Sequence, residues 1–380
     1  MNDSGTKAWA EKAWQNAEKK IRRNAEIYGS SLLETAYDGK WYVPDYLNCW
    51  TDGFWPGILW LTYEVTGEER FLRLARECEE KMDSVLKTPE NIGHDSGFMW
   101  SLMSVADYKL TGSDAAKRRG IRAAMSLASR FNPSGRFIRS WGDILGKDTK
   151  SWTIVDNAMN LPILFWCSEV QGDPRFSNIA CIHADTMLKY TVRADGSVNH
   201  IIKIDPYTGE YIGDREDCLE YTQGCGLESS WTRGQAWAIY GMALAYRYTK
   251  NKEYLDAAKR CAHYFIACLD ETFVPPIDFR GETERMGRDS SAGAIAACGM
   301  LEIAQHVPKC EKRVYFRGAE RILKGLEKYC TSESEEIQCI LMHGATHYNA
   351  TKTRDVGLIY GDYFYLEAIG RIYKDVTVFW

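Results

Sequence analysis

The 380 residues of the chain are enough for two average domains or for one large helical ring or barrel. Apolar residues make up 45% of the sequence and charged residues 26%, which is ordinary for a globular protein with a sizeable core. The formal net charge is −5 and the basic residues form no stripe, so nucleic acid is not an expected partner. No apolar run approaches the roughly 18 residues of a membrane span, so a membrane is not expected either.

In chain order, two kinds of helical segment alternate. One-sided amphipathic helices are predicted near residues 5–28, 68–87, 113–131, 173–191, 252–270 and 310–330. Between them lie segments that are apolar on nearly all sides, as buried helices are; they open at Trp50, His94, Val155, Trp231, Arg288 and Tyr360. In the first three, an aspartate precedes by 15 to 17 positions a glycine suited to end the helix, namely Gly67, Gly112 and Gly172.

Six buried helices alternating with six half-exposed ones predict an all-α fold, an (α/α)6 toroid with the buried set inside and the amphipathic set outside. The toroid takes the whole chain, residues 1–380, as a single domain. Strand patterning is nearly absent, apart from a hairpin that we expect over residues 197–213.

The cysteines and the N-terminus indicate the compartment. The 12 cysteines are scattered along the chain without a CxxC pair, and the first residues, MNDSGTKAWAEKAWQNAEKK, are polar and contain no apolar signal core. Thiols scattered in this way are expected to be reduced and to pack as small apolar side chains. We therefore expect a cytoplasmic protein.

The inner helices of such a ring run parallel, so their N-termini share one rim with the long connections 132–151, 192–230, 271–287 and 331–359. Five aspartates fall at or near these helix starts: Asp52, Asp95, Asp156, Asp289 and Asp362. An aspartate in this position is commonly a helix cap. Carboxylates that converge also raise one another's pKa, as a proton donor near neutral pH requires. The pattern makes at least one of the five a plausible acid but does not say which.

Other residues near the rim suit a sugar ligand. Indole rings stack on sugars but also fill cores, and the candidates are Trp50, Trp141, Trp231 and Trp237. The stretch TQGCGLESSWTRGQAW offers hydrogen-bond donors in Gln223, Arg233 and Gln235. The alternative for Arg233 is a buried ion pair with an aspartate that ties two inner helices together. His200, in the expected hairpin, suits either a hydroxyl contact or a structural role.

Metal chemistry has little support in the sequence. His343 and His347 have the HxxxH spacing of helical zinc ligands, but MHGATHYNATK is typical of a loop and has no cysteine or third histidine nearby. No GxSxG elbow, Walker loop or GxGxxG context occurs. Helical double rings also include terpene cyclases and prenyltransferases, whose aspartate-rich magnesium clusters or zinc ligand sets are not visible here. We expect no metal and no organic cofactor.

Six stretches together resemble the unsaturated glucuronyl hydrolases of glycoside hydrolase family 88: WTDGFWPGILWL, HDSGFMWSL, VDNAMNLPILFW, SSWTRGQAWAIYG, RDSSAGAIAACGMLEIA and YGDYFYLEA. They span residues 50 to 370 in order, and other sugar-active (α/α)6 families share the fold but not this set. The resemblance implies an enzyme that removes the Δ4,5-unsaturated uronic acid from the non-reducing end of oligosaccharides made by polysaccharide lyases, typically glycosaminoglycan disaccharides.

In that family the C4=C5 enol ether is protonated and then hydrated, so that one carboxyl group serves as acid and then as base. The resemblance places this general acid/base on Asp156, and on Asp95 a second carboxylate that binds substrate and tunes the first. It implies substrate contacts at His200, Gln223, Trp231 and Arg233, and aromatic walls at Trp50 and Trp141. Members that favour sulfated disaccharides carry a Ser/Lys cluster before the last inner helix; Lys352 matches the lysine but no serine matches, so a strong sulfate preference is not implied.

Three alternatives stay open. The related unsaturated rhamnogalacturonyl hydrolases have the same fold and chemistry but act on pectin fragments, so the aglycone distinguishes them. A sugar epimerase on this toroid would rely on a histidine pair at the rim, for which His94 and His200 are the candidates. A carbohydrate-binding protein would need no acid with a raised pKa. The expected partner is an unsaturated uronyl oligosaccharide, and the expected state is a monomer or weak homo-oligomer.

Overall fold

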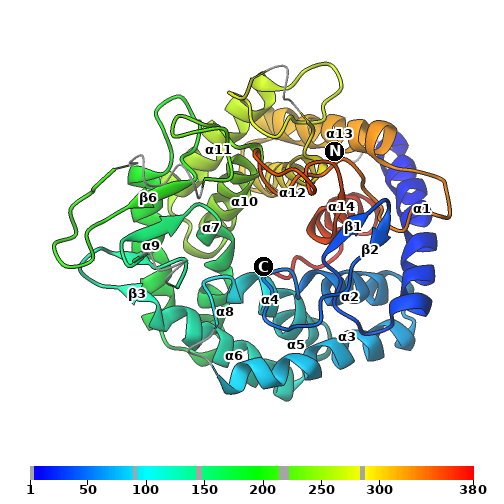
Figure 1. The fold of residues 1–380 in the computed structure, drawn as a ribbon, viewed down its shortest axis with the longest axis horizontal. Coiled ribbons are helices and arrows are strands. Elements are labelled where there is room, and N and C mark those ends of the chain that lie inside the picture. The colour runs from blue at the N-terminus through cyan, green and yellow to red at the C-terminus, as the bar shows by residue number, and fades with distance from the viewer. Residues whose placement is uncertain (1–3, 89–91, 143–147, 214–221, 283–286) are drawn as a thin grey trace.

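The helices form two concentric rings (Figure 1). The computed structural model describes residues 4–88, 92–142, 148–213, 222–282 and 287–380. The outer ring consists of α1 (Ser4–Tyr28), α3 (Glu69–Lys81), α6 (Asp114–Ser129), α9 (Arg175–Tyr190), α11 (Lys252–Cys268) and α13 (Lys309–Cys330). The inner ring consists of α2 (Phe54–Thr66), α4 and α5 (Ser96–Trp100, Ala106–Thr111), α7 and α8 (Asn157–Asn160, Pro162–Gln171), α10 (Thr232–Thr249), α12 (Ser290–His306) and α14 (Ile359–Tyr373). The predicted (α/α)6 toroid is confirmed.

Burial explains which helices lie inside. Helix α12 of the inner ring buries every residue from Ser290 to Ala304, whereas α13 of the outer ring buries one stripe along its length. The predicted helix ends are confirmed, because Gly67, Gly112 and Gly172 have φ angles of 72°, 74° and 65°, in the left-handed region that favours glycine. Within the described ranges, no helix is long and apolar enough to cross a membrane.

Two inner helices are interrupted near the rim, which the apolar pattern does not indicate. The segment after Asp95 passes from α4 through five residues of π-helix, η3 (Ser101–Val105), into α5. The segment after Asp156 forms the single turn of α7, and α8 then begins at Pro162. Proline cannot donate to the hydrogen-bond ladder but fits the first turn of a new helix. Both aspartates that the resemblance singles out therefore precede very short helices.

Short strands join the rim loops to one another. A three-stranded sheet of order β2-β1-β7 contains β1 (Thr35–Tyr37), β2 (Lys40–Trp41) and β7 (Gly357–Leu358), and a two-stranded sheet contains β3 (Phe131–Asn132) and β4 (Phe137–Ile138). The hairpin expected over residues 197–213 is present, since Ile204 forms an antiparallel bridge with Tyr211.

One further strand pair, which we did not predict, places two candidate residues together. β5 (Trp152–Ile154) pairs antiparallel with β6 (Ile201–Lys203). His200 directly precedes β6, and Asp156 follows β5 after one residue, so the pairing brings the two residues close although 44 positions separate them in the sequence. The histidine expected in the hairpin therefore belongs to the same rim as the aspartate.

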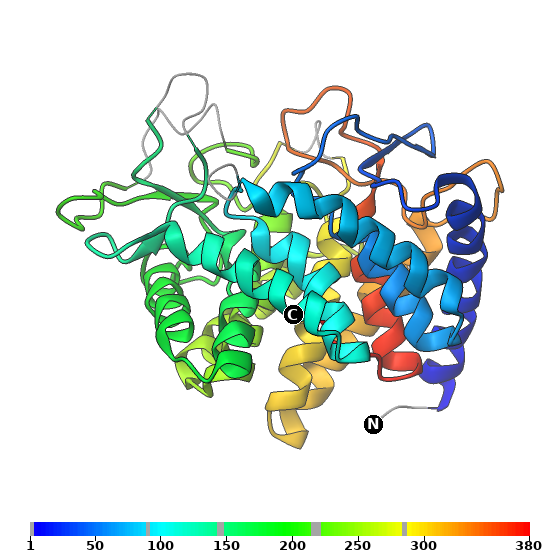
Figure 2. The same ribbon diagram turned by 90° about the horizontal axis from the view of Figure 1, so that it is seen from below.

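The long connections gather at one end of the toroid, where the inner helices begin (Figure 2). In this view the β1–β2 segment and the loop before α14 stand at the top, and the hairpin after β6 projects to the left. This arrangement agrees with the predicted rim. The active site is therefore to be sought at this end.

The residues at the C-terminus fill the middle of the ring (Figure 1). Trp380 is buried, and its ring stacks on Phe364 with centroids 5.6 Å apart and meets Phe98 edge-on at 5.9 Å. The Lys109 Nζ atom donates hydrogen bonds to the backbone carbonyls of residues 378, 379 and 380. This segment occupies the bore of the toroid behind the rim, and it supports Phe98 of α4 from below.

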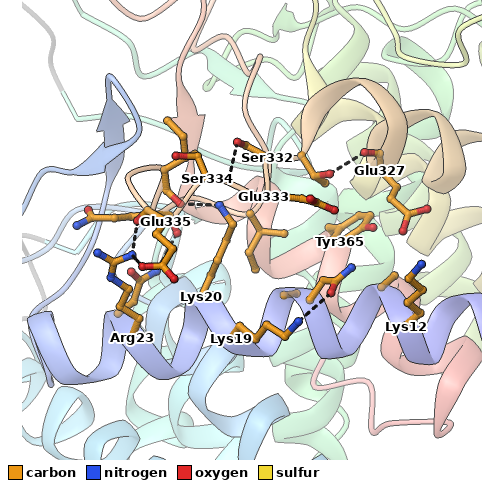
Figure 3. A pocket seen from close by; sticks show the side chains of 18 of the residues that line it. Lys12, Lys19, Lys20, Arg23, Glu327, Ser332, Glu333, Ser334, Glu335 and Tyr365 are labelled. Carbon is orange, nitrogen blue, oxygen red and sulfur yellow. Dashed lines mark hydrogen bonds and ion pairs between the residues drawn. The ribbon is translucent and has the colours of Figure 1, made fainter.

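A cavity of about 880 Å³ lies on the outside of the ring, between α1 and residues 331–338 (Figure 3). Several of its charged side chains have partners in the protein. Lys20 Nζ donates to the backbone carbonyls of Ile337 and Cys339, and Arg23 pairs with Glu335 at 3.6 Å. None of the candidate site residues lines this cavity.

Candidate active site

Asp156 and Asp95 lie at the starts of neighbouring inner helices. Asn160 links them, because its Nδ2 donates to Asp95 Oδ1 at 3.2 Å and to the backbone oxygen of Asp156 at 3.3 Å. The close crossing of the two helices depends on Gly97, where a Cβ atom would lie 2.5 Å from the Asn160 Cα. The two carboxylic side chains keep some exposure, 13% for Asp156 and 21% for Asp95.

Hydrogen-bond partners divide the five rim aspartates into two groups. Asp52 and Asp362 accept hydrogen bonds from backbone amides of the loops that precede their helices, and Asp289 caps α12 through a backbone amide. Among the described residues, Asp95 and Asp156 make no capping hydrogen bond although both occupy N-cap positions. The Oδ2 atom of Asp156 is buried without any hydrogen-bond partner in the described part of the chain. The helix-cap interpretation therefore holds for Asp289 and fails for these two.

Both uncapped carboxyls have raised pKa values. Burial, together with the charge of Asp95, raises the pKa of Asp156 to about 7 against the opposing charge of Arg233. Burial also raises the pKa of Asp95 to about 7, although the hydrogen bond from Asn160 and the charge of Arg130 favour its ionised form. A helix N-terminus favours the ionised form of both carboxyls, but burial is the larger effect on each pKa.

Two uncharged histidines flank the carboxyls. His200 Nε2 lies 3.8 Å from Asp156 Oδ2. His200 Nδ1 accepts a hydrogen bond from the backbone N–H of Gln223 at 3.1 Å, so the proton of the neutral ring is on Nε2. His94 Nε2 lies 3.3 Å from Asp95 Oδ1. Burial lowers the pKa of both histidines to about 3, so both rings are neutral at pH 7. The Nε2–H group of His200 is therefore a neutral donor beside Asp156.

Arg233 is held by the protein on several sides. Its Nη1 donates to Asp289 Oδ2 at 2.8 Å, its Nη2 donates to Gln223 Oε1 at 3.1 Å, and both also donate to backbone carbonyls of the loop before α14. The guanidinium lies over the Trp231 ring, 4.5 Å from the centroid. The buried ion pair that was one of the two interpretations of Arg233 is thus present, and it ties α10 to α12. The same arginine orients Gln223 and Trp231 and places a positive charge near Asp156.

Aromatic rings line both sides of the carboxyls. The half-buried ring of Trp141 lies 6.5 Å from the rings of both His94 and His200. The half-buried ring of Trp50 packs on Tyr360 at 4.8 Å between centroids. The structure thus brings eight predicted site residues into one cluster: Asp156, Asp95, His200, Gln223, Trp231, Arg233, Trp50 and Trp141. Gln235, the other predicted donor, instead donates to the backbone carbonyls of Gly196 and Cys261.

The structure adds residues that the sequence did not single out. Asn160 joins the Asp95 carboxyl to the backbone oxygen of Asp156, and its position four residues after Asp156, on the same helix face, is the signal that could have identified it. Tyr360 lies between Trp50 and the Arg233 guanidinium, 5.3 Å below the latter. Trp237, which was already one of the four tryptophan candidates, also takes part, because its indole favours the ionised form of Asp156.

The HxxxH motif lies in a loop, as expected, and serves a structural contact. His343 Nδ1 lies 2.7 Å from Asp355 Oδ1. The backbone of His343 has a φ angle of 61°, which a continuous helix does not allow. In the part of the chain that the structure describes, no group of three or more His, Cys, Asp or Glu is arranged to hold a metal ion.

Comparison with known proteins identifies the family. The profile of Glycosyl Hydrolase Family 88 matches residues 16–356. The chain is 35% identical to the unsaturated glucuronyl hydrolase of Bacillus sp. (strain GL1), over 94% of this chain and 95% of that protein. It is 33% identical to the unsaturated chondroitin disaccharide hydrolase of Streptococcus pyogenes serotype M1, over 95% of this chain and 90% of that protein.

A solved structure supports the same assignment. The crystal structure of unsaturated glucuronyl hydrolase from Streptococcus agalactiae superposes with a TM-score of 0.90. Its sequence is 32% identical, and the alignment covers 98% of this chain and 94% of that chain. The chain therefore belongs to glycosyl hydrolase family 88 and is a glycosidase of that family.

Proposed function

We propose that the protein removes the Δ4,5-unsaturated uronic acid from the non-reducing end of lyase-generated oligosaccharides, and that glycosaminoglycan disaccharides are its substrates. The observation that carries this proposal is the linked pair Asp156 and Asp95, two carboxyls without caps whose pKa values lie near 7. Its relatives include an unsaturated glucuronyl hydrolase and an unsaturated chondroitin disaccharide hydrolase. These names favour glycosaminoglycan fragments over the pectin-derived alternative.

In the proposed reaction Asp156 acts first as an acid. It donates its proton to C4 of the substrate's C4=C5 bond, and the positive charge that develops at C5 is shared with the ring oxygen. Water then adds at C5 and gives its proton to the Asp156 carboxylate, which restores the acid. The C5 hemiketal opens to a ketone by breaking the bond to the ring oxygen, and C1, now a hemiacetal, becomes an aldehyde as the aglycone leaves as an alcohol. In glycosidases that displace the aglycone directly, the distance between two carboxylates predicts retention or inversion. That rule does not apply to this route.

The neighbours of Asp156 have separate roles in this scheme. Asp95, held by Asn160, keeps Asp156 protonated and accepts a hydrogen bond from a substrate hydroxyl. The neutral His200 and the amide of Gln223 donate hydrogen bonds to the uronate, and Arg233 acts through its charge and by holding Gln223 and Trp231. The indoles of Trp50 and Trp141 form the walls on which the sugar rings stack.

All of these residues come from one chain, which supports catalysis by a monomer or a weakly associated homo-oligomer. The cysteines that the structure describes are free thiols, in keeping with a cytoplasmic location. Lys352 is exposed in the loop before α14, and none of the serines expected of sulfate-preferring members accompanies it in sequence. We propose unsulfated or weakly sulfated disaccharides as the preferred substrates.

The substrate assignment is tested by incubating the protein with an unsaturated chondroitin disaccharide and following the ultraviolet absorbance of the conjugated alkene. We expect the absorbance to fall, because hydration removes the C4=C5 bond. An unsaturated rhamnogalacturonan disaccharide, assayed in parallel, is expected to react more slowly. If no unsaturated uronide is consumed, the proposal is wrong, and faster decay of the pectin fragment would reverse the assignment of the aglycone.

The pH dependence of the reaction tests the coupling of the two carboxyls. Since the proton donor must be protonated, we expect kcat to be highest below the pKa of Asp156, about 7, and to fall as the pH rises through it. The charge of Asp95 helps to raise that pKa, so Asp95→Asn is expected to move the alkaline limb of the residual activity to lower pH. A limb that stays in place in this variant would show that Asp95 does not tune Asp156.

A further inference from the structure

Exposed apolar side chains are concentrated on one segment beside the rim. The large apolar residues exposed there are Tyr37, Tyr42, Val43, Tyr46 and Leu47, and two of them reach 46% (Tyr42) and 53% (Tyr46) exposure. We refer to the exposed side chains within residues 42–47 as the Tyr42–Tyr46 face, after its two tyrosines. A contiguous apolar group on the surface is more often a binding surface than an accident of folding.

The backbone around this face is well anchored. The Tyr42 N–H donates to the Thr35 carbonyl at 2.9 Å, and the Trp41 N–H donates to Gln338 Oε1 at 2.9 Å. Beyond the face, Asp52 Oδ2 accepts hydrogen bonds from the backbone amides of residues 48 and 49 at 2.9 and 3.0 Å. The aromatic rings are therefore presented by an ordered backbone, so that little conformational entropy is lost when a ligand binds.

The face is continuous with the catalytic cluster. Residues 42–47 run directly into Trp50, whose ring packs on Tyr360. The Glu34 N–H donates to the Tyr42 carbonyl at 3.2 Å, and the Glu34 carbonyl accepts a hydrogen bond from the Ile359 N–H at 3.1 Å, next to Tyr360. Tyr360 in turn lies against the Arg233 guanidinium. A ligand that leaves the carboxyls past Trp50 therefore meets the Tyr42–Tyr46 face next.

The chemistry of the face selects neutral sugar rings. Aromatic rings bind the C–H faces of pyranoses, and residues 41–49 contain one acid, Asp45, and no lysine or arginine. Sulfate groups would therefore find no opposite charge on this segment. An enzyme that cleaves at the non-reducing end binds the uronate at the catalytic carboxyls. The rest of the bound oligosaccharide must therefore extend outward across the rim.

We propose that the Tyr42–Tyr46 face is a binding site for the unsulfated pyranose rings of longer substrates, those that follow the disaccharide toward the reducing end. The proposal rests on the proposed function. It makes the protein an enzyme that uses oligosaccharides longer than a disaccharide, with Tyr42 and Tyr46 as the side chains that stack on the additional rings.

The test compares two unsulfated substrates, an unsaturated chondroitin disaccharide and the corresponding tetrasaccharide, in the Tyr42→Ala and Tyr46→Ala variants. We expect kcat/KM for the tetrasaccharide to fall about 3- to 10-fold in each variant, the loss of one aromatic contact, with kcat/KM for the disaccharide within about 2-fold of the unmodified protein. Tyr46→Phe, which keeps the ring but loses the hydroxyl, is expected to retain tetrasaccharide activity. Tyr329→Ala, at a tyrosine of α13 that is 45% exposed on the outer ring, is the matched control and should change neither rate.

The possible results separate this proposal from the proposed function. Equal losses on both substrates, or unchanged rates on the tetrasaccharide, would overturn the proposal while leaving the hydrolase intact. Sedimentation analysis of the same variants tests whether a second copy of the chain covers the face instead. If Tyr46→Ala lost dimers but lowered kcat/KM no more for the tetrasaccharide than for the disaccharide, the face would be a contact between copies. If the unmodified protein consumed neither substrate, the proposed function itself would fall.

Discussion

Replacing Asp156 by asparagine is expected to lower kcat on an unsaturated disaccharide by about 10²- to 10⁴-fold, the range that a positioned general acid contributes. The amide has nearly the same size as the carboxyl but no acidic proton to give at neutral pH. Asp156 makes no capping hydrogen bond among the described residues, so the fold does not depend on its carboxylate. We therefore expect the melting temperature to stay within a few degrees of that of the unmodified protein, and the loss to appear in kcat as measured by alkene absorbance.

Asp52→Asn is the matched control for this experiment. Asp52 is also a buried rim aspartate whose pKa is raised to about 7, chiefly by burial, but its carboxylate is bound to backbone amides of the preceding loop. We expect this variant to lose about 1 to 3 kcal/mol of stability while keeping kcat within about 10-fold. Full activity in Asp156→Asn, or a folded Asp52→Asn that is equally inactive, would place the general acid elsewhere.

Much of the fold could be predicted because it rests on a simple repeat. A helix that is apolar all round is stable only inside, and a one-sided helix must cover it, so the alternation fixes the two rings. We did not predict the break at Pro162, which marks the start of α8, although a proline suits the first turn of a new helix. The π-helical segment Ser101–Val105 was not predictable, because it contains no glycine or proline and depends on how its neighbours pack.

The candidate site shows where local sequence signals end. The rim aspartates share one local sequence pattern, an aspartate before an apolar helix. They differ in which parts of the chain supply their hydrogen-bond partners. The amides that bind Asp362, for example, come from residues 340 and 341, more than 20 positions earlier in the chain. The contact between His200 and Asp156 depends on the β5–β6 pairing, which links segments more than 40 positions apart in the sequence. Only the family resemblance singled out Asp156 from the sequence, and the absence of a cap among the described residues now gives a physical reason for that choice.

The largest change in stability is expected from Glu302→Gln, at the end of the inner helices opposite the rim. Glu302 is fully buried on α12, and its carboxylate accepts hydrogen bonds from Arg247 Nε and Arg371 Nη2, each at 2.8 Å. His306 Nε2 lies 2.7 Å from Oε1. The glutamine would leave two buried guanidinium groups without their shared counter-charge, and removing one partner of a buried ion pair costs about 3 to 5 kcal/mol. We expect a loss of this size in urea unfolding at neutral pH.

The pH dependence of stability provides a second measurement on the same variant. Burial opposes the ionisation of Glu302, but His306, Arg371 and Arg247 together hold its pKa below the ordinary value of 4.5. A group whose pKa is lower in the folded state stabilises the protein above its unfolded pKa, and this contribution is lost as the pH falls below that value. The unmodified protein should therefore lose stability below about pH 4.5 more steeply than Glu302→Gln.

A surface pair provides the control for the buried cluster. Glu335 is 92% exposed and lies 3.6 Å from Arg23, so Glu335→Gln is expected to change stability by less than about 1 kcal/mol. If Glu302→Gln were no less stable than Glu335→Gln at neutral pH, the charge cluster would contribute nothing to the closure of the ring. In that case α10, α12 and α14 would be held together by their apolar contacts and by their other polar links, such as the Arg233–Asp289 pair and the hydrogen bond from Arg371 to the Cys298 carbonyl.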